Sequence, residues 1–546
     1  MNDHFVEAPQ NISRSLTPAP DLDYHEYLTG NYSSSFFVHS LSPHKVTKII
    51  LGLKNSSGGG HMDIPTRVFK SIADIISNPL SIILNKYITN GNFPEMLKIA
   101  QVTPVFKSGD PTDPNNYRPI SVLSVLSKVF EKHIYDELLS YLKSFDILVD
   151  EQCGFREGIS TNFAIGKFLN HIVESVNEKK FSVGVFLDLK KAFDCVDHSI
   201  LLQKLYHYGV RGAALNLIES FLSNRTQYVK ICNQKSSIAH TNIGTPQGSV
   251  LSPLLFLVFI NDLVNCSRVL NFNLFADDTC ISLKNSNLNN LYNTLNRELV
   301  KVNNWISANK LALNISKTVY LLFSGKRAIS ELPILYLNNE PIQRQHSTKF
   351  LGLILDERLS WNAHAQHVNG KVSRLAGIFY RIRNFLPSHA LKTIYYALFQ
   401  SQLQYGIVFW SGVNKTKFDQ IFRVQKKIIR FITNSDRLAH TTPLFKDLAI
   451  LKLDDLRKLE MAKFVFNDVG GPNFFNFTVQ SSIHSYNTRN QSSIRLPQPR
   501  SNTLLRSVFY EGIKIFNGLD PDIKSSNTAA AFKIKLKSSL IANYSS

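Results

Sequence analysis

Three aspartates have the residue type and the setting for acid–base chemistry or for binding metal ions. Asp277 and Asp278 stand side by side in "VLNFNLFADDTCISL", an apolar stretch that predicts a strand, a turn and a second strand. Asp188 comes at the end of "KFSVGVFLDL", another apolar run. A carboxylate in apolar surroundings costs free energy unless positive charge compensates it. The sequence therefore predicts that these carboxylates face a site where that charge is supplied.

Two strands of one sheet must position these carboxylates. In the run before Asp188, Val183 and Val185 fall on one face, and Phe186 and Asp188 fall on the other. If neighbouring strands present the two groups, Asp188 and Asp277 can meet although 89 positions separate them. Such a pair can act as general acid and base. It can also hold two divalent metal ions about 3.5–4 Å apart for in-line phosphoryl transfer.

The simpler interpretation of an aspartate near a strand end is a turn or a helix cap. Asp194 and Asp197 suit that role, because both precede the predicted helix "HSILLQKL". An Asp-Asp pair in a hairpin turn is also often structural. The apolar flanks of Asp277 and Asp278 argue against this, since ordinary turns lie in polar sequence.

The charge balance favours a polyanionic partner. The 546-residue chain has 61 Lys+Arg against 41 Asp+Glu, a formal net charge of +20. Residues 1–360 carry a net charge of +4, and residues 361–546 carry +16. Nucleic acid is the first candidate partner and an anionic membrane surface the second. The last third of the chain is expected to contact a phosphate backbone.

Composition also excludes several classes. Five scattered cysteines form no CxxC pair, which argues against a disulfide framework or a zinc knuckle and favours a reduced, intracellular compartment. No secretory signal is visible at the N-terminus, so we expect a protein that is not secreted. The run "VLSPLLFLVFI" contains Pro253 and is too short to span a bilayer, so it predicts a buried helix and no membrane partner.

The predicted elements give an α+β chain. Residues 1–45 are interpreted as a loose polar lead-in. Strand patterns occur around residues 93–123, 180–189, 225–242, 269–283, 316–324 and 348–361, separated by helical periodicity. From about residue 363 onward the pattern is almost wholly helical.

Seven blocks in order resemble the catalytic region of reverse transcriptases, most closely those of non-LTR (LINE-type, jockey-like) retrotransposons. They are "PVFKSGDPTDPNNYRPISVLSVLSKVFEKHI", "EQCGFREGIST", "FLDLKKAFDCVDHSILLQKL", "GTPQGSVLSPLLFLVFINDL", "FADD", "NISKT" and "KFLGLILD". The resemblance covers about Val46 to Trp361. It implies an RNA-directed DNA polymerase with a right-hand fold. The implied parts are a fingers-like region (46–182) within which a reverse transcriptase domain begins (88–355), a palm core with an antiparallel sheet (183–355), a helical thumb-like region (356–440) and a basic helical C-terminal region (441–546).

The resemblance also implies a two-metal site. Asp188 corresponds to the first metal-binding aspartate, Asp277 to the second, and Asp278 to the adjacent carboxylate of the same motif. The backbone carbonyl of Leu189 can also ligate metal. Two Mg²⁺ ions suit carboxylates that are completed by substrate phosphates, and Mn²⁺ could replace them.

Further positions match residues that bind the incoming dNTP. Lys107 and Arg118 match contacts to the triphosphate, for which a guanidinium is well suited. Phe193 matches the bulky residue that selects deoxynucleotides, although it could equally be a core aromatic. Gln247 matches a residue beside the nascent base pair, and Gly248 would allow close backbone approach. Lys317 matches a lysine that protonates departing pyrophosphate; the alternative is an ordinary exposed lysine.

The basic helices after residue 361 resemble a thumb that holds the duplex of RNA template and DNA primer. An ordinary solvated helix face is the alternative interpretation of their cations, which are Lys371, Arg374, Arg381 and Arg383. His364 and His367 have a metal-like spacing but no third ligand, so they are interpreted as plain helix surface.

Two features set this chain apart from complete elements of that type. Only about 45 residues precede the resemblance, so no endonuclease domain is expected ahead of it, and no ribonuclease H pattern is visible. We expect a shortened copy with an intact polymerase site, located in the nucleus, the cytoplasm or both. The alternative is a catalytically silent relic that only binds nucleic acid, and an RNA-templated RNA polymerase is a third possibility that Phe193 argues against.

Overall fold

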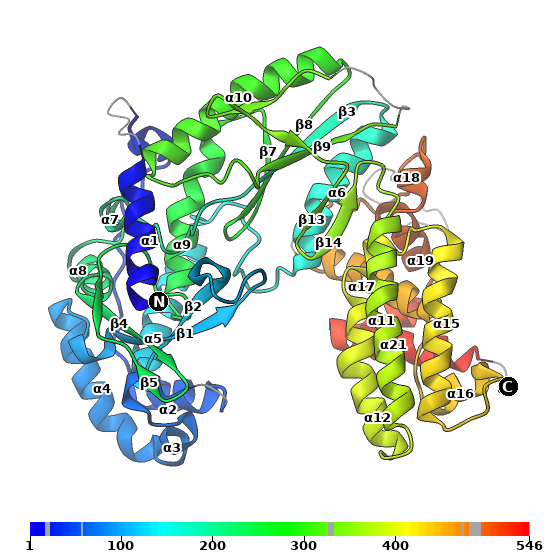
Figure 1. Cartoon of the computed structure of the whole chain (residues 1–546), viewed down its shortest axis with the longest axis horizontal. Coiled ribbons are helices and arrows are strands. Elements are labelled where there is room, and N and C mark those ends of the chain that lie inside the picture. The colour runs from blue at the N-terminus through cyan, green and yellow to red at the C-terminus, as the bar shows by residue number, and fades with distance from the viewer. Residues whose placement is uncertain (17–21, 56–57, 326–331, 472–473, 480–492, 545–546) are drawn as a thin grey trace.

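The computed structural model describes the whole chain except residues 17–21, 56–57, 326–331, 472–473, 480–492 and 545–546. A central five-stranded sheet lies between an N-terminal body and a C-terminal body of helices (Figure 1). Its strand order is β12-β9-β3-β8-β7, with β12 Gln343–Arg344, β9 Val319–Phe323, β3 Phe181–Leu187, β8 Asp278–Asn285 and β7 Asn271–Phe275. Strand β3 is antiparallel to both β8 and β9. The mixture of helices and mainly antiparallel strands agrees with the predicted α+β class.

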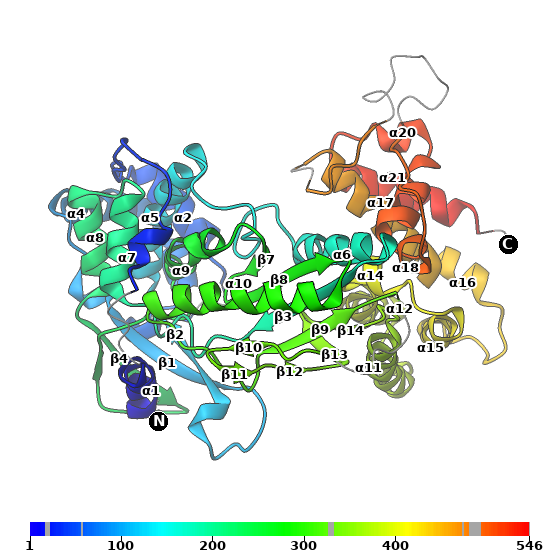
Figure 2. The same cartoon turned by 90° about the horizontal axis from the view of Figure 1, so that it is seen from above.

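Strand β3 is buried along its whole length because both faces of the sheet are covered. Val183 and Val185 join the core that contains α9 (Ser252–Ile260) and α10 (Leu288–Ala308). Phe186 packs on the opposite face against Phe168 of α6 (Thr161–Asn177). Seen from above, α10 crosses the sheet (Figure 2). The predicted alternation of β3 and the predicted buried helix, α9, are both confirmed.

The N-terminal body contains a second sheet, and strands β1 and β2 of that sheet form a hairpin. Strands β1 (Ile99–Phe106) and β2 (Tyr117–Val122) are antiparallel, and β1 also runs parallel to β4 (Arg225–Ile231). Two short strands, β5 Gln234–Lys235 and β6 Ala239–Thr241, pair with β4. The helices of this body are α2 Pro43–Gly52, α3 Thr66–Ser71, α4 Ala73–Asn90, α5 Val125–Ser144, α7 His198–His207 and α8 Gly212–Leu222.

The prediction of a loose lead-in over residues 1–45 is wrong for the part that the structure describes. Helix α1 (Asn2–Ser15) packs on the second sheet, where Phe5 contacts Val102 and Val229. The Asn2 side-chain amide donates to the carbonyl of Ser237 at 2.9 Å. The apolar residues of this segment are scattered singly among polar ones, so no periodic pattern predicts that they are buried.

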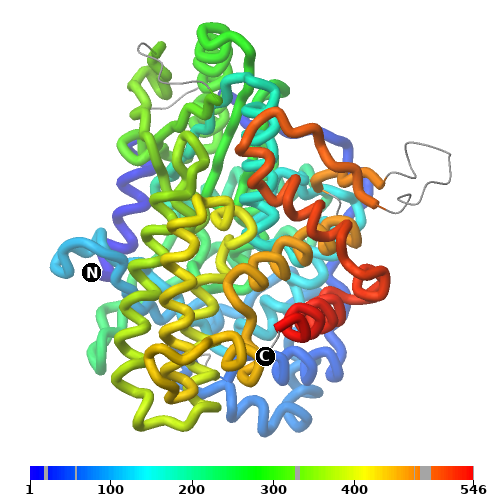
Figure 3. The backbone as a smooth tube through the Cα atoms, turned by 90° about the vertical axis from the view of Figure 1, so that its right-hand side faces the viewer, coloured from blue at the N-terminus to red at the C-terminus, as the bar shows by residue number. Residues whose placement is uncertain are grey.

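The C-terminal body shares one core with the central sheet. Phe163 of α6 stacks on Phe464 of α17, with ring centroids 5.3 Å apart. A hairpin of β13 (Ser347–Phe350) and β14 (Leu353–Asp356) leads into it, while β10 Tyr336–Leu337 and β11 Glu340–Pro341 form a separate small pair. The stacked helices are seen in Figure 3. They are α11 Asn362–Ile382, α12 Ser388–Ile394, α13 Ser401–Gln404, α14 Ile407–Trp410, α15 Lys415–Ile432, α16 Thr441–Asp447, α17 Leu453–Val469, α18 Asn502–Leu505, α19 Ile513–Asn517, α20 Pro521–Lys524 and α21 Ala529–Ala542.

Candidate active site

The structure brings the three predicted aspartates to one end of the central sheet. Leu187, the last residue of β3, pairs with Thr279 of β8, so Asp188 follows directly beside the strand that begins at Asp278. Ala276 and Asp277 form the two-residue turn between β7 and β8, in which Phe275 pairs with Asp278. Neighbouring strands therefore present these carboxylates together, as predicted.

The electrostatics of the turn show an excess of negative charge. The side chains of Asp277 and Asp278 are exposed, yet the surrounding protein displaces enough water to raise their pKa values. Partial desolvation, helped by the charges of Asp277 and Asp188, raises the pKa of Asp278 to about 6. Desolvation and the charge of Asp188 also raise the pKa of Asp277, which Arg118 partly offsets. The site thus favours a group that brings positive charge.

Three cations lie in the same electrostatic neighbourhood as Asp188. Arg118 of β2 pairs with Val105 of β1, and Lys107 follows β1 in the same hairpin. Partial desolvation and the positive charges of Arg118 and Lys317 lower the pKa of Lys107, whereas Asp188 opposes this shift. All three cations are exposed, so they can meet a ligand without losing a buried partner.

The segment that carries Lys317 is hydrogen-bonded to the end of β3. The backbone N–H of Asn314 donates to the carbonyl of Asp188 at 2.8 Å, and the Asp188 N–H donates to Thr318 Oγ1 at 3.3 Å. Leu189 forms an isolated antiparallel bridge with Leu313. These contacts fix the backbone on both sides of Asp188 and bring the "NISKT" block to the carboxylates.

Phe193 is half-buried and packs against α9. Its ring stacks on Phe256 with centroids 4.3 Å apart and contacts Phe155 edge-on at 6.3 Å. Its carbonyl accepts a hydrogen bond from the Thr245 N–H at 2.8 Å. One face of the Phe193 ring therefore packs against the core through Phe256. This packing fixes the position of the ring's outer edge.

Gln247 and Gly248 lie in a loop that is held by β2 and by Asp194. Gln247 Nε2 donates to both carboxylate oxygens of Asp194, at 2.8 and 3.0 Å, and its carbonyl accepts from the Ser121 N–H at 2.7 Å. Gly248 has φ 124°, and a Cβ there would lie 2.3 Å from the Ser121 carbonyl oxygen. The backbone at Gly248 therefore approaches β2 closely, whereas its approach to the nascent base pair stays a prediction.

Asp194 corrects the prediction that it caps a helix. Asp197 is the N-cap of α7 and accepts from the Ile200 N–H at 3.0 Å, whereas Asp194 orients Gln247. Burial raises the pKa of Asp194 to about 6, against the opposing effects of the Gln247 hydrogen bond and Lys191. Its residue type and spacing match those of an ordinary cap, so only the fold separates the two aspartates.

Glu131 is a second residue that sequence reasoning missed. It is fully buried in α5, and its carboxylate accepts from Ser249 Oγ at 2.5 Å and from the Val250 N–H at 2.8 Å. It also accepts from Ser127 Oγ at 2.7 Å. This carboxylate from another helix thereby caps the start of α9, next to the Gln247–Gly248 loop. A lone glutamate in amphipathic helical sequence gives no signal of such a role.

The basic residues of α11 differ in their surroundings. Lys371 is half-exposed, while Arg374 and Arg381 are exposed. The guanidinium of Arg383 instead lies over the rings of Tyr380 and Phe431, at 4.7 and 5.4 Å.

The histidines of α11 correct one prediction. His367 is exposed as predicted, but His364 is 3 % exposed, and its Nδ1 accepts from the Ile354 N–H at 3.2 Å. Its ring faces inward because the start of α11 packs on β14. Nothing about this pair indicates a metal site.

The aspartates fit a metal that a substrate helps to hold. Within the described residues, no group of three or more histidine, cysteine, aspartate or glutamate side chains could hold a metal ion by itself. Mg²⁺ does not need such a group, because one or two carboxylates with substrate phosphates and water complete its octahedron. Desolvation and neighbouring carboxylates raise the pKa values of Asp277 and Asp278, so a cation beside them would be favoured. The donors present therefore suit Mg²⁺ together with a triphosphate.

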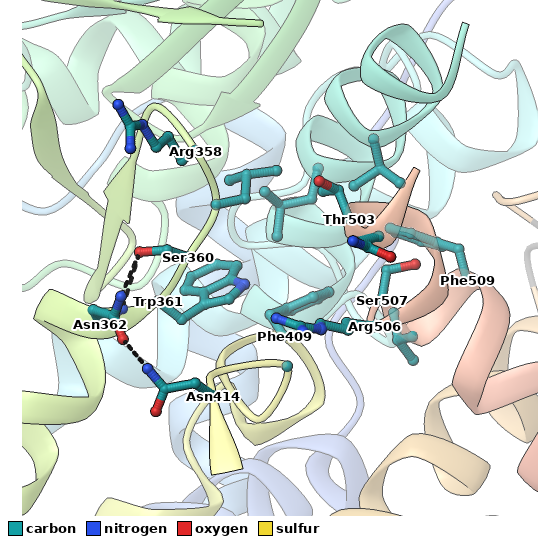
Figure 4. A pocket seen from close by; sticks show the side chains of 16 residues that line it. Arg358, Ser360, Trp361, Asn362, Phe409, Asn414, Thr503, Arg506, Ser507 and Phe509 are labelled. Atoms are coloured by element: carbon teal, nitrogen blue, oxygen red, sulfur yellow. Dashed lines mark hydrogen bonds between the residues drawn. The ribbon is translucent and has the colours of Figure 1, made fainter. Parts of the chain in front are cut away.

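A separate pocket of about 290 Å³ lies among α6, α14, α18 and the turn before α11 (Figure 4). It is lined by aromatic and polar side chains, including Trp361 and Phe409. Asn362 Nδ2 donates to Ser360 Oγ at 3.2 Å, and Asn414 Nδ2 donates to Asn362 Oδ1 at 3.1 Å. None of the predicted site residues lines this pocket, so no catalytic role is assigned to it.

The clustered carboxylates, the antiparallel sheet and the facing cations define a candidate phosphoryl-transfer protein. Residues 106–355 match the family described as reverse transcriptase (RNA-dependent DNA polymerase). This stretch holds all of the predicted catalytic and substrate-binding residues. The match covers the part of the chain that holds the carboxylates and the facing cations, and it implies the polymerase fold of that family, whose members generally use divalent metals.

Curated relatives indicate which kind of reverse transcriptase the chain resembles. The chain is 28 % identical to the RNA-directed DNA polymerase from mobile element jockey of Drosophila melanogaster, covering 82 % of this chain and 49 % of the relative. It is 26 % identical to the probable RNA-directed DNA polymerase from transposon X-element of the same species, covering 76 % and 46 %. For transposon BS the identity is 28 %, covering 69 % and 43 %. The predicted resemblance to reverse transcriptases of non-LTR retrotransposons is confirmed, and the chain spans about half the length of these relatives. No helix in the described ranges is long and apolar enough to cross a membrane.

Proposed function

We propose that this chain catalyses RNA-directed DNA synthesis, adding dNTPs to the 3′-OH of a DNA primer on an RNA template. One observation carries the proposal: Asp188 and the Asp277–Asp278 turn converge beside Lys107, Arg118 and Lys317 inside the region that matches reverse transcriptases. The partners that this function requires are RNA template, DNA primer or target, and dNTPs.

The bodies described above correspond, in this proposal, to the parts of a right hand. The N-terminal body within residues 46–182 acts as fingers, the central sheet within 183–355 as palm, and the helices of 356–440 as thumb. Residues 441–546 extend the thumb core. The position of the β1–β2 hairpin supports this arrangement, because it brings Lys107 near Asp188 and Arg118 near Asp277.

Each side chain then has a task in binding or orienting the reactants. Asp188 and Asp277, with the Leu189 carbonyl, would hold the metal ions that align the hydroxyl with the α-phosphate, and Asp278 shapes the local charge. Two bound Mg²⁺ ions would lower the hydroxyl pKa and neutralise the phosphates. Lys107 and Arg118 bind the triphosphate, and Lys317 donates a proton to the departing pyrophosphate.

Three further proposed roles concern the selection of deoxynucleotides and the binding of the nucleic-acid duplex. The edge of Phe193 excludes a ribose 2′-OH, and the Gln247–Gly248 loop packs beside the nascent pair. Lys371, Arg374 and Arg381 contact duplex phosphates. Arg383 contributes less, because its guanidinium is engaged with two rings. We also propose an intracellular location, in the nucleus, the cytoplasm or both, which the five free cysteines support.

Primer extension on poly(rA)·oligo(dT) tests the function. The purified chain should incorporate dTTP in Mg²⁺, and chelation by EDTA should abolish incorporation. Asp277→Ala should reduce the rate by roughly 10³-fold or more, as expected when a metal-binding carboxylate is lost. Asp74→Ala, at an exposed aspartate of α4, is the matched control and should leave the rate unchanged. Wild-type incorporation no better than that of Asp277→Ala would favour the silent nucleic-acid-binding relic.

A further inference from the structure

The segment Glu151–Gly154 lies along β7 and ends at the aspartate turn. The Leu274 N–H donates to the Glu151 carbonyl at 3.0 Å, and the Cys153 N–H donates to the Leu274 carbonyl at 2.8 Å. These bonds accompany a parallel bridge between Gln152 and Leu274. A loop residue is thereby brought to the edge of the catalytic sheet.

Gln152 holds the turn through its side-chain oxygen. It is 0 % exposed, and its Oε1 accepts from the Ala276 N–H at 3.0 Å and from the Gly154 N–H at 2.8 Å. Ala276 directly precedes Asp277 and has φ 56°, a left-handed conformation that costs free energy for a residue with a Cβ. Such a conformation persists where surrounding contacts determine it.

Gly154 completes the contact. A Cβ at this position would lie 2.3 Å from the Ala276 nitrogen and 2.8 Å from the Phe275 carbonyl carbon. The backbone of the loop thus touches the backbone of the turn without room for a side chain. Gln152 and Gly154 together fix where the turn starts.

The amide nitrogen of Gln152 indicates that the amide oxygen is the functional atom. Its Nε2 is buried without a hydrogen-bond partner among the described residues. An unpaired buried donor is unfavourable, so a glutamine here is explained by its acceptor. An amide also supplies that acceptor without adding a further negative charge beside Asp277 and Asp278.

We propose that Gln152 is a positioning residue that sets the conformation of the Ala276–Asp277 turn and so aims the Asp277 carboxylate. This inference rests on the proposed function. It predicts that loss of the acceptor slows the chemical step more than it weakens substrate binding, since a displaced catalytic group costs rate even when the substrate still binds.

Two variants of Gln152 separate the acceptor from the bulk of the side chain. Gln152→Met keeps the length and removes the acceptor, whereas Gln152→Glu keeps an acceptor oxygen. In the Met variant we expect kcat per folded molecule to fall by roughly 10–100-fold, with the KM for dTTP changed less than about threefold. Hydrogen–deuterium exchange of a peptide covering 275–278 should become faster by roughly 10-fold. The Glu variant should keep the slow exchange of the wild type.

Asn273→Ala is the matched control. Asn273 is also a buried amide, 2 % exposed, with one unpaired atom, and it lies on β7 itself. Its Nδ2 donates to the Ala164 carbonyl of α6 at 2.7 Å rather than to the turn. The control should lower the melting temperature without changing kcat or the exchange of 275–278.

The outcomes distinguish this inference from the proposed function. An inactive wild type contradicts the function itself. With an active wild type, equal kcat in the Met variant, or unchanged exchange of 275–278, overturns the role of Gln152. Exchange that is as fast in the Glu variant as in the Met variant also overturns it, because the acceptor would then not be the cause.

Discussion

At the scale of single residues, two carboxyl groups near the aspartate turn have raised pKa values for different physical reasons. Burial raises the pKa of Asp194 to about 6, and Gln247 donates two hydrogen bonds to it. The same pKa of about 6 at Asp278 arises from partial desolvation and from neighbouring carboxylates. A raised carboxyl pKa has a stability consequence that can be measured.

Asp194→Asn tests that consequence. Between about pH 4 and pH 6 the folded wild type keeps a proton on Asp194 that the unfolded chain releases. The free energy of unfolding therefore falls as the pH rises through this window. The variant should lack the part of this decrease in unfolding free energy that Asp194 causes, which is on the order of 1–3 kcal/mol. Urea unfolding at pH 4 and pH 7 measures it, and an identical pH dependence in both proteins would contradict it.

Single residues were predictable where their own strand places them. Alternation in the run before Asp188 and the apolar flanks of Asp277 indicated that these groups can meet if neighbouring strands present them, and the structure pairs those strands. Asp194 and Glu131 were not predictable, because their partners come from segments 53 and 118 positions away. Nothing in a local pattern distinguishes such a buried acceptor from a helix cap or a surface charge.

At the scale of elements, the loop 245–249 is held from two sides. Strand β2 contacts it through the backbone of Ser121, and α5 contacts it through Glu131 at the start of α9. The same helix α9 supports the ring of Phe193 through Phe256. Helix α9 therefore links Phe193 and the loop 245–249 to the N-terminal body.

Glu131→Ala tests the importance of that link for stability. It leaves the Ser249 hydroxyl and the N–H groups of Val250 and Leu251 without their buried acceptor, which should cost about 2–4 kcal/mol. Glu137→Gln on the same helix removes an ion pair with Lys45 and should cost within about 1 kcal/mol. Chemical denaturation compares the two, and equal losses would contradict the capping role of Glu131.

Elements with a clear pattern of apolar residues were predicted well, whereas elements with few apolar residues were not. The all-apolar run of α9 and the alternation of β3 became the elements expected from them. Helix α1 was not predicted because its few buried side chains, such as Phe5, gain their apolar contacts from distant strands of the second sheet.

At the scale of the whole molecule, the central sheet lies between two bodies, and the charge is unevenly distributed between the parts. Residues 361–546 carry a net charge of +16 of the total +20. They share their core with α6 of the central sheet, so the basic helices are held in a fixed relation to the aspartates. The composition predicted this charge excess, but the common core follows only from the fold.

The salt dependence of nucleic-acid binding tests the grip of α11. Arg374→Ala with Arg381→Ala should reduce the slope of log K against log salt by roughly 1.5, because each lost phosphate contact removes about 0.7–0.9. Lys48→Ala with Lys86→Ala, at exposed residues of α2 and α4, removes the same charge elsewhere and should leave the slope nearly unchanged. Filter binding to an RNA–DNA duplex measures both, and equal slopes in the two double variants would contradict the placement of the duplex.

The central claim is that carboxylates from two neighbouring strands act as one catalytic unit. Primer extension by Asp188→Asn, Asp277→Asn and the double variant tests it most directly. Each single variant should lose roughly 10³-fold or more in rate, and the double variant should lose little beyond that, because residues that act together are not additive. Single variants that retain most of their activity, or losses that multiply in the double variant, would contradict the account.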